Sequence, residues 1–178
     1  MIQYLKQIGN LSDIKNTRVR TALRGIILKD DNILLLRTSK GDLKFPGGGL
    51  EGNETYEEAL IREIREETGY VNVSIQMGND FASYIERKVD EFELHTVFES
   101  RSYYLFAEIK DDERVTLKLD DYEEELQFQA EWISIKDAIN QNTYALVSDE
   151  GPNDWVEREL TILKAIWAWK ISNKIEEK

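Results

Sequence analysis

The sequence contains no cysteine, only two prolines and a single histidine, His95. Without cysteine the chain can form neither a disulfide nor a thiolate-bound metal site, which fits a protein kept in a reducing compartment. We therefore expect a cytoplasmic protein. A metal site in this chain would have to use oxygen ligands or His95.

Basic residues are scarce relative to acidic ones. The chain has 23 Lys and Arg against 35 Asp and Glu, which gives a net charge of -12. Nucleic acids are bound mainly through fields of Lys and Arg, so we expect no nucleic-acid partner. A small polyanion remains compatible with this charge if metal ions neutralise its site locally.

Long apolar runs are absent as well. The longest runs, at 26–28 and 33–36, are much shorter than a membrane span. Residues 1–16 mix charged with apolar residues and lack the apolar centre of a signal peptide. We expect neither export nor a membrane partner.

The composition is that of a folded domain. The chain has 178 residues, 41% of them apolar, which is enough for one domain with a sizeable core. No linker rich in Pro, Gly or Ser divides it. We predict one domain over residues 1–178, with residues 1–17 as an N-terminal extension or an edge element.

Short strand-like segments alternate with two helical patterns. Residues 18–28 and 33–37 flank a turn signal at 30–32 and predict a hairpin. This pattern predicts an α/β fold in which helices cover a mixed β-sheet. The other predicted elements are strands at 71–77, 81–85, 94–98, 102–109 and 130–135, a Trp-rich helix at 154–171, and acidic loops at 111–114 and 120–125.

A helix with clear start and stop signals is predicted at 55–68. Thr55 with Glu58 three residues later is a capping-box pattern, and Gly69 is well placed to end the helix. Three glycines at 47–49 precede it. Such a cluster indicates backbone that bends sharply or lies close to another group.

Three glutamates crowd one side of this helix. With Glu63 at 0°, Glu67 lies at about 40° and Glu66 at about 300°, so they share an arc of about 100° beside the apolar stripe. Like charges at this spacing repel by roughly 0.2–0.5 kcal/mol per pair. One interpretation is a solvated face with Glu–Arg pairs; the other is a site for a hard cation, which prefers carboxylate oxygens.

The wider spacing favours the second interpretation. Gly48 is followed by Glu54, then Arg62-Glu63, an aliphatic residue, Glu66-Glu67 and Gly69. This pattern resembles the signature of the Nudix hydrolase family at every charged and glycine position. Tyr70 stands where an aliphatic residue is usual, and we expect it to serve packing.

The resemblance implies a fold, a reaction and a cofactor. The fold would be a Nudix-type α/β/α sandwich with a mixed β-sheet, a catalytic loop and helix at 47–69, and a C-terminal helix. The reaction would be hydrolysis, by water and Mg²⁺ or Mn²⁺, of the pyrophosphate linkage in a nucleoside diphosphate joined to another moiety. The implied metal ligands are Glu63 and Glu67, completed by Glu66 and the carbonyl of Gly47. Arg62 and Glu54 would pair and hold the loop against the helix.

The general base and the substrate-binding residues are less well defined by the sequence. The family places its base either on the signature helix or on a glutamate of a later loop; among Glu123, Glu124, Glu125 and Glu131 we favour Glu124, although a charge run is commonly just solvated. On the segments that lead to the glycine loop, Arg24, Arg37 and Lys44 could contact substrate phosphates or pair with surplus acid.

The substrate and partners stay open at this level. Nucleoside triphosphates, dinucleoside polyphosphates and nucleotide sugars are all compatible, whereas the ADP-ribose subgroup is disfavoured because the only prolines are Pro46 and Pro152. A non-catalytic nucleotide-binding or regulatory module of the same fold is the main alternative. A third is an acidic scaffold whose Trp-rich helix binds a protein, and exposed tryptophans there would mark a homodimer face.

Overall fold

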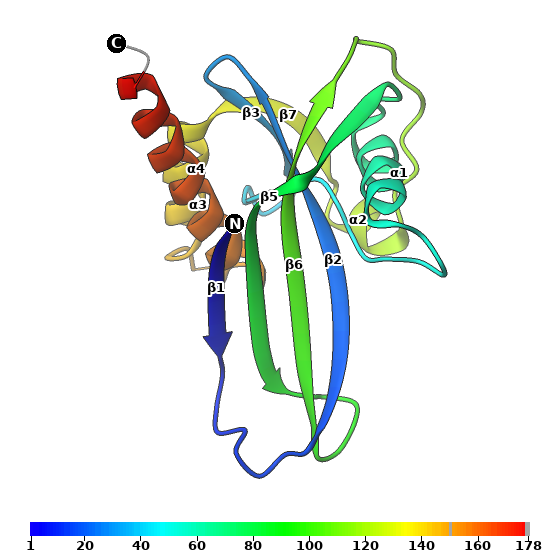
Figure 1. The fold of residues 1–178 in the computed structure, drawn as a ribbon, viewed down its shortest axis with the longest axis vertical. Coiled ribbons are helices and arrows are strands. Elements are labelled where there is room, and N and C mark those ends of the chain that lie inside the picture. Colours follow the sequence, from blue (N-terminus) through cyan, green and yellow to red (C-terminus); the bar gives the residue numbers. More distant parts are fainter. Residues whose placement is uncertain (150, 177–178) are drawn as a thin grey trace.

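A mixed sheet forms the centre of the computed structural model, which describes residues 1–149 and 151–176 (Figure 1). Within this part of the chain seven strands pair in the order β1-β5-β6-β2-β3-β4, and β7 joins β3. The β1–β5 and β2–β6 pairs are parallel and the others antiparallel. The strands are β1 (Ile2–Gln7), β2 (Asn16–Lys29), β3 (Asn32–Arg37), β4 (Leu43–Lys44), β5 (Val73–Val89), β6 (Thr96–Ile109) and β7 (Gln129–Ser134).

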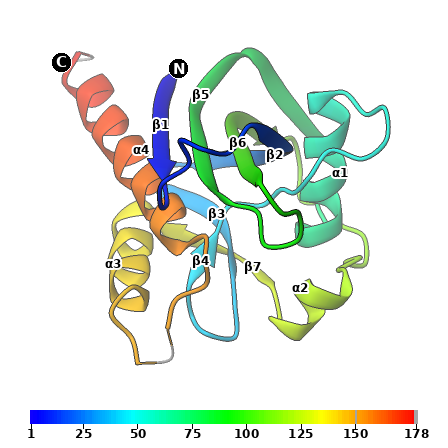
Figure 2. The same ribbon diagram turned by 90° about the horizontal axis from the view of Figure 1, so that it is seen from below.

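Helices cover the sheet from two sides. Helices α1 and α2 lie on one side, and α3 and α4 lie together on the other (Figure 2). Their bounds are α1 (Tyr56–Thr68), α2 (Asp121–Glu125), α3 (Ile135–Ala145) and α4 (Val156–Glu176). The predicted α/β/α sandwich with a mixed sheet is thus confirmed. None of the described helices is both long enough and apolar enough to cross a membrane.

Side chains along the central strands point alternately to the two faces of the sheet, which divides the core into two clusters. In β3, Ile33 and Leu35 pack in one cluster with Leu163 of α4, whereas Leu34 packs in the other with Leu60 of α1. Successive strand residues point to opposite faces, so one apolar run can serve both helical layers. The short apolar runs of the sequence are therefore strands buried on both faces.

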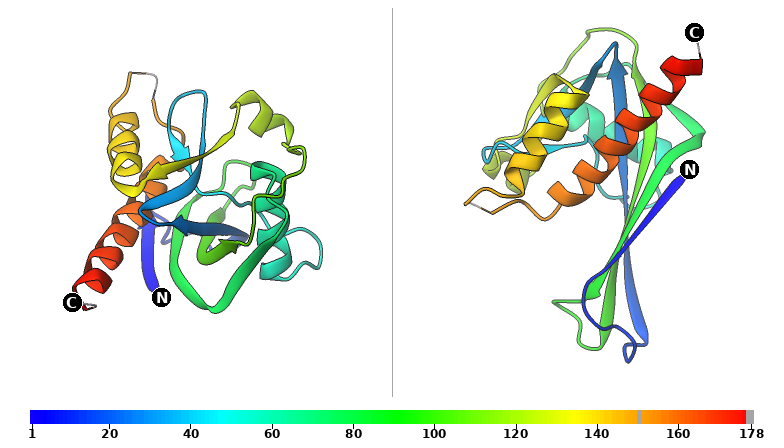
Figure 3. Two further views of the ribbon diagram at one scale, coloured as in Figure 1. Left: turned by 90° about the horizontal axis from the view of Figure 1, so that it is seen from above. Right: turned by 90° about the vertical axis from the view of Figure 1, so that its left-hand side faces the viewer.

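Strands β2, β5 and β6 extend well beyond the helices (Figure 3). The sequence predicted two strands, 71–77 and 81–85, where the structure has only β5; its pairing with β6 is irregular between Ile75 and Ala82, around Gly78 at φ +79°. A bulge thus lies where the sequence analysis expected one strand to end and the next to begin. The segments 94–98 and 102–109 likewise belong largely to one strand, β6, which continues through residues 99–101 between them.

Two helices were missed by the sequence analysis. The acidic segment at 120–125, predicted as a loop, contains α2, and α3 directly follows β7. The predicted β2–β3 hairpin is present, with Leu28 opposite Ile33. Helix α4 starts after Trp155, and its Trp169 packs against Phe106 while remaining 38% exposed. A homodimer through this helix stays a prediction.

A buried amide of α3 fixes β4, the strand that leads into the glycine segment. The Asn142 side chain is fully buried. Its Oδ1 accepts a hydrogen bond from the Leu43 N–H at 2.8 Å, and its Nδ2 donates to the Leu43 carbonyl at 2.9 Å. Because β4 is only two residues long, this side chain supplies pairing that a longer strand would provide by itself.

We predict that Asn142→Ala lowers the free energy of unfolding by roughly 2–4 kcal/mol, because it leaves a buried N–H and a buried carbonyl unsatisfied. Asn140→Ala on the same helix is the matched control, since Asn140 is exposed, and should change stability by less than about 0.5 kcal/mol. Urea unfolding measures both. Equal losses would contradict this role for Asn142.

Candidate functional site

Capping interactions fix where α1 begins and where it ends. Thr55 Oγ1 accepts from the Glu58 N–H at 3.2 Å, and the Glu58 carboxylate accepts from the Thr55 N–H at 2.9 Å. Gly69, at φ +80°, ends the helix in the left-handed conformation. The predicted capping box and stop are confirmed. They set which face of the helix meets the sheet, and this face includes Glu63 and Glu67.

Three buried carboxylates meet at this face. Oxygens of Glu63, Glu67 and Glu123 all lie within 4.8 Å of one another. Glu67 is completely buried, and Glu63 and Glu123 are each 9% exposed. Burial without water and mutual repulsion both oppose ionisation of such groups. The cluster is therefore costly for the fold unless positive charge reaches it.

Glu67 is held by two donors from the segment that includes β4 and the glycines. The Gly47 N–H donates to Oε2 at 2.5 Å and Lys44 Nζ donates to Oε1 at 2.9 Å. Lys44 is itself buried, with its ammonium 4.5 Å from the centre of the Phe128 ring. Burial, opposed by the Lys44 charge and reinforced by Glu123 and Glu63, raises the pKa of Glu67 to about 7.

Arg62 joins the loop before α1 to the helix. Its guanidinium binds both oxygens of Glu54, at 2.7 and 3.0 Å, so the expected pair is present. It also donates to the Gly49 carbonyl at 3.1 Å, to Glu63 at 2.9 Å and to Glu66 at 3.2 Å. One planar donor thus fixes the glycine segment and three carboxylates together. Burial raises the pKa of Glu63 against the opposing charge of Arg62.

The glycine segment passes close to both β2 and α1. The carbonyls of Pro46 and Gly48 accept from Gly25 and Leu23 of β2, at 2.8 and 2.9 Å. Gly47 has φ +132°, and a Cβ there would overlap the Leu23 carbonyl oxygen; a Cβ at Gly48 would overlap the Glu63 carboxylate. No hydrogen bond to the Gly47 carbonyl is found among the described residues. That carbonyl remains available to a ligand.

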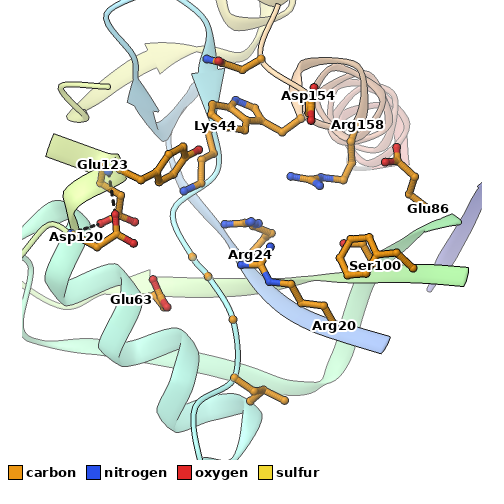
Figure 4. A pocket seen from close by; sticks show the side chains of 18 of the residues that line it. Arg20, Arg24, Lys44, Glu63, Glu86, Ser100, Asp120, Glu123, Asp154 and Arg158 are labelled. Carbon is orange, nitrogen blue, oxygen red and sulfur yellow. Dashed lines mark hydrogen bonds between the residues drawn. The ribbon is translucent and has the colours of Figure 1, made fainter. Parts of the chain in front are cut away.

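A cavity of about 830 Å³ opens beside the carboxylates (Figure 4). One part of its lining is acidic and another is basic. The acidic part comes from α1 and the segment around α2, and the basic part from β2, β4 and α4, with Glu86 and Asp154 lying near Arg158 on the basic side. The lining includes Glu63, Asp120 and Glu123 on the acidic side, Arg20, Arg24, Lys44 and Arg158 on the basic side, and the aromatic residues Tyr122 and Trp155.

Several of the residues predicted from sequence lie elsewhere. Glu124 is exposed on α2 and is not part of the carboxylate cluster. Glu66 pairs with Arg62 and, at 3.3 Å, with Lys118 instead of joining the cluster. Arg37 binds Glu131 across the β3–β7 pair and does not line the cavity. Tyr70 is buried, as expected for a packing residue.

Glu123, which the sequence analysis ranked below Glu124, is the residue that α2 directs to the cluster. Asp120 caps this helix by accepting from the Glu123 N–H at 2.8 Å, while the Glu123 carboxylate accepts from the Asp120 N–H at 3.0 Å. The spacing Asp120-x-x-Glu123 is a capping-box signal that could have singled out Glu123 within the acidic run. No comparable local signal marks Arg158 in α4.

The described geometry is accompanied by clear similarity to known proteins. The NUDIX domain model matches residues 19–153, and the chain therefore belongs to the NUDIX family. It is 43% identical over 77 residues to the ADP-ribose pyrophosphatase of Methanocaldococcus jannaschii. The matched region covers 39% of this chain and only 46% of that relative.

Two solved structures share the fold over most of the chain. A NUDIX hydrolase from Nitrosomonas europaea has a TM-score of 0.53 and 19% identity, covering 87% of this chain and 90% of the other. The E. coli ORF135 protein has a TM-score of 0.51 and 21% identity, and the match covers 88% of this chain and 94% of the other. At such identities the likeness concerns the fold alone.

The raised pKa of Glu67 predicts how the metal-free protein responds to pH. Its folded value of about 7 lies above the value of about 4.3 for an unfolded glutamate. The folded state therefore holds the extra proton between these values, and this contribution to stability is complete below about pH 4 and lost as pH rises through about 7.

We predict that Glu67→Gln removes this loss. In EDTA, between pH 5 and 8, the variant should lose about 1–3 kcal/mol less of its free energy of unfolding than the unchanged protein. Glu66→Gln is the matched control and should keep the original pH dependence. Urea unfolding at a series of pH values measures this, and parallel curves for all three proteins would contradict it.

Proposed function

We propose that the protein is a metal-dependent hydrolase that cleaves the pyrophosphate linkage of a nucleoside diphosphate joined to another moiety. The observation that supports this best is the cluster of Glu63, Glu67 and Glu123 beside a cavity with an opposing basic wall. A diphosphate ester has the charge to bind the basic wall, and the carboxylates are suited to hold the cations that such an ester needs. The acidic net charge of the chain is then no obstacle.

The donor set fits Mg²⁺ or Mn²⁺. Three carboxylates whose oxygens lie within 4.8 Å, with no cysteine in the chain, are ligands for a hard cation. We propose Glu63, Glu67 and Glu123 as ligands together with the Gly47 carbonyl, and Glu66 as a further ligand that would exchange its contacts with Arg62 and Lys118 for the ion. A bound ion would lower the pKa of a water molecule and offset charge on the phosphate oxygens.

Other residues would hold the metal ligands in position and activate the attacking water. The water oxygen attacks phosphorus while the P–O bond of the anhydride breaks, and the water proton must pass to a base. Glu123 fits the role of this base better than Glu124, because it is in the cluster and no hydrogen bond to its Oε1 is found among the described residues. Arg62 and Glu54 would hold the metal-binding carboxylates in place.

Two alternatives concern substrate and turnover. ADP-ribose is a candidate substrate because a curated relative is named ADP-ribose pyrophosphatase. The proline pattern of the sequence disfavours it relative to nucleoside triphosphates, dinucleoside polyphosphates and nucleotide sugars.

A non-catalytic nucleotide-binding module is favoured by one observation: both oxygens of Glu67 already accept hydrogen bonds, from Lys44 and Gly47. Turnover assays separate the two functions.

The adjacent residues Glu123 and Glu124 give a matched test. With Mg²⁺ or Mn²⁺ and a panel of nucleoside diphosphate derivatives, Glu123→Gln should lower kcat by roughly 10²–10⁴-fold, as expected for loss of a base or ligand. Glu124→Gln removes the same charge one residue away, at an exposed position, and should stay close to the unchanged protein. The reverse order would return the role to Glu124.

The same panel tests the hydrolase proposal itself. Hydrolysis of at least one member, lost in Glu67→Gln, is the expected result. Binding of a panel nucleotide without any turnover would support the non-catalytic module instead. Undiminished turnover by Glu67→Gln would contradict the metal-binding role of the cluster.

A further inference from the structure

Arg24 is a buried cation with two guanidinium nitrogens that no described residue satisfies. Its side chain is on β2 and lines the cavity (Figure 4), and the residue is only 6% exposed. Nε and Nη1 have no hydrogen-bond partner among the described residues. Leaving such groups unpaired in the interior is costly, so buried donors are nearly always satisfied. A partner for Arg24 is therefore expected from outside the chain.

Two further guanidiniums line the same basic wall. Arg20 lies four residues earlier on β2, at the same parity, is exposed to solvent, and has no hydrogen bond or ion pair among the described residues. Arg158 comes from α4 and is fixed by Glu159 at 2.8 Å and by the Tyr104 hydroxyl at 3.1 Å.

The charge of these groups is only partly compensated within the protein. The buried Glu159 neutralises Arg158, and it also accepts from the Phe45 N–H at 3.3 Å and the Tyr104 hydroxyl at 3.2 Å. Among the residues that the structure describes, neither Arg20 nor Arg24 has such a counter-charge in contact. Glu86 and Asp154 also line this side of the cavity near Arg158 (Figure 4), so the uncompensated positive charge of the basic wall lies at Arg20 and Arg24.

This wall is immediately next to the carboxylates. The glycine segment borders both: a Cβ at Gly48 would overlap Glu63, and a Cβ at Gly49 would lie 3.7 Å from Arg20 Nη2. The carboxylate of Glu63 and the guanidinium of Arg20 therefore flank adjacent residues of one backbone segment. A chain of linked phosphates can contact both at once.

We propose that Arg20, Arg24 and Arg158 form a subsite for an additional phosphate of the substrate, next to the pair of phosphates hydrolysed at the carboxylates. The inference rests on the proposed function and narrows its substrate class. It favours nucleoside triphosphates and dinucleoside polyphosphates over ADP-ribose and nucleotide sugars. An uncharged sugar at this wall would leave the guanidiniums without an anion, and such mismatches are strongly discriminated against.

The first test measures binding without metal or turnover. In EDTA, isothermal titration with inorganic tripolyphosphate reports the basic wall alone, because no metal bridges the probe to the carboxylates. The unchanged protein should bind, and Arg20→Gln and Arg24→Gln should each weaken binding by roughly tenfold or more. Arg65→Gln removes one charge from the exposed face of α1, outside the cavity, and should bind like the unchanged protein.

Absence of binding by the unchanged protein would overturn the subsite. Equal weakening by all three variants would also overturn it, because that pattern reports net charge. Thermal unfolding without ligand shows whether each variant is folded. If Arg24→Gln does not fold, the exposed Arg20→Gln still decides the result.

The second test measures selectivity with Mg²⁺ or Mn²⁺. The kcat/KM of the unchanged protein should be highest for a nucleoside triphosphate or dinucleoside polyphosphate, and Arg20→Gln should lower that value roughly tenfold or more while changing ADP-ribose hydrolysis much less. Equal losses on all substrates, or a preference for ADP-ribose, would overturn the subsite and leave the hydrolase proposal intact. Hydrolysis of no substrate would instead overturn the hydrolase proposal, with the EDTA titration still deciding the subsite.

Discussion

Burial of the Glu67 carboxylate is the constraint on which the site depends. The fully buried group is acceptable only because the Gly47 N–H and the Lys44 ammonium reach it, and both donors come from one segment, β4 and the glycines that follow it. That segment must lie flat against β2, so Gly47 takes a conformation open mainly to glycine. The strained loop and the crowded helix thus stabilise each other.

The surrounding fold serves to hold that segment in place. Asn142 of α3 pairs with β4 before the glycines, Arg62 of α1 binds the Gly49 carbonyl after them, and Glu159 of α4 accepts from Phe45. Three helices from both layers therefore act on a few residues of backbone. This arrangement also explains why the basic wall and the carboxylates are adjacent: both lie on elements that contact the same segment.

The sequence predicted the local features well, because their causes lie within a few residues. The capping box of Thr55 and Glu58, the stop at Gly69 and the inward arc of Glu63 and Glu67 all follow from helix geometry. Long-range contacts were not predictable in this way. Nothing in the local sequence brings Arg158 to the cavity, since its place depends on how α4 packs on the sheet. The errors at β5 and α2 came from a bulge that resembles a break between two strands and from a short capped helix that resembles a loop.

The most direct test of the account is the location of a bound cation. Crystals soaked in Mn²⁺ should show an anomalous scattering peak among the carboxylates of Glu63, Glu67 and Glu123, and this peak should disappear in Glu67→Gln. A peak elsewhere on the acidic surface, with none at this cluster, would contradict the claim that the buried glutamates of α1 and α2 form a metal site.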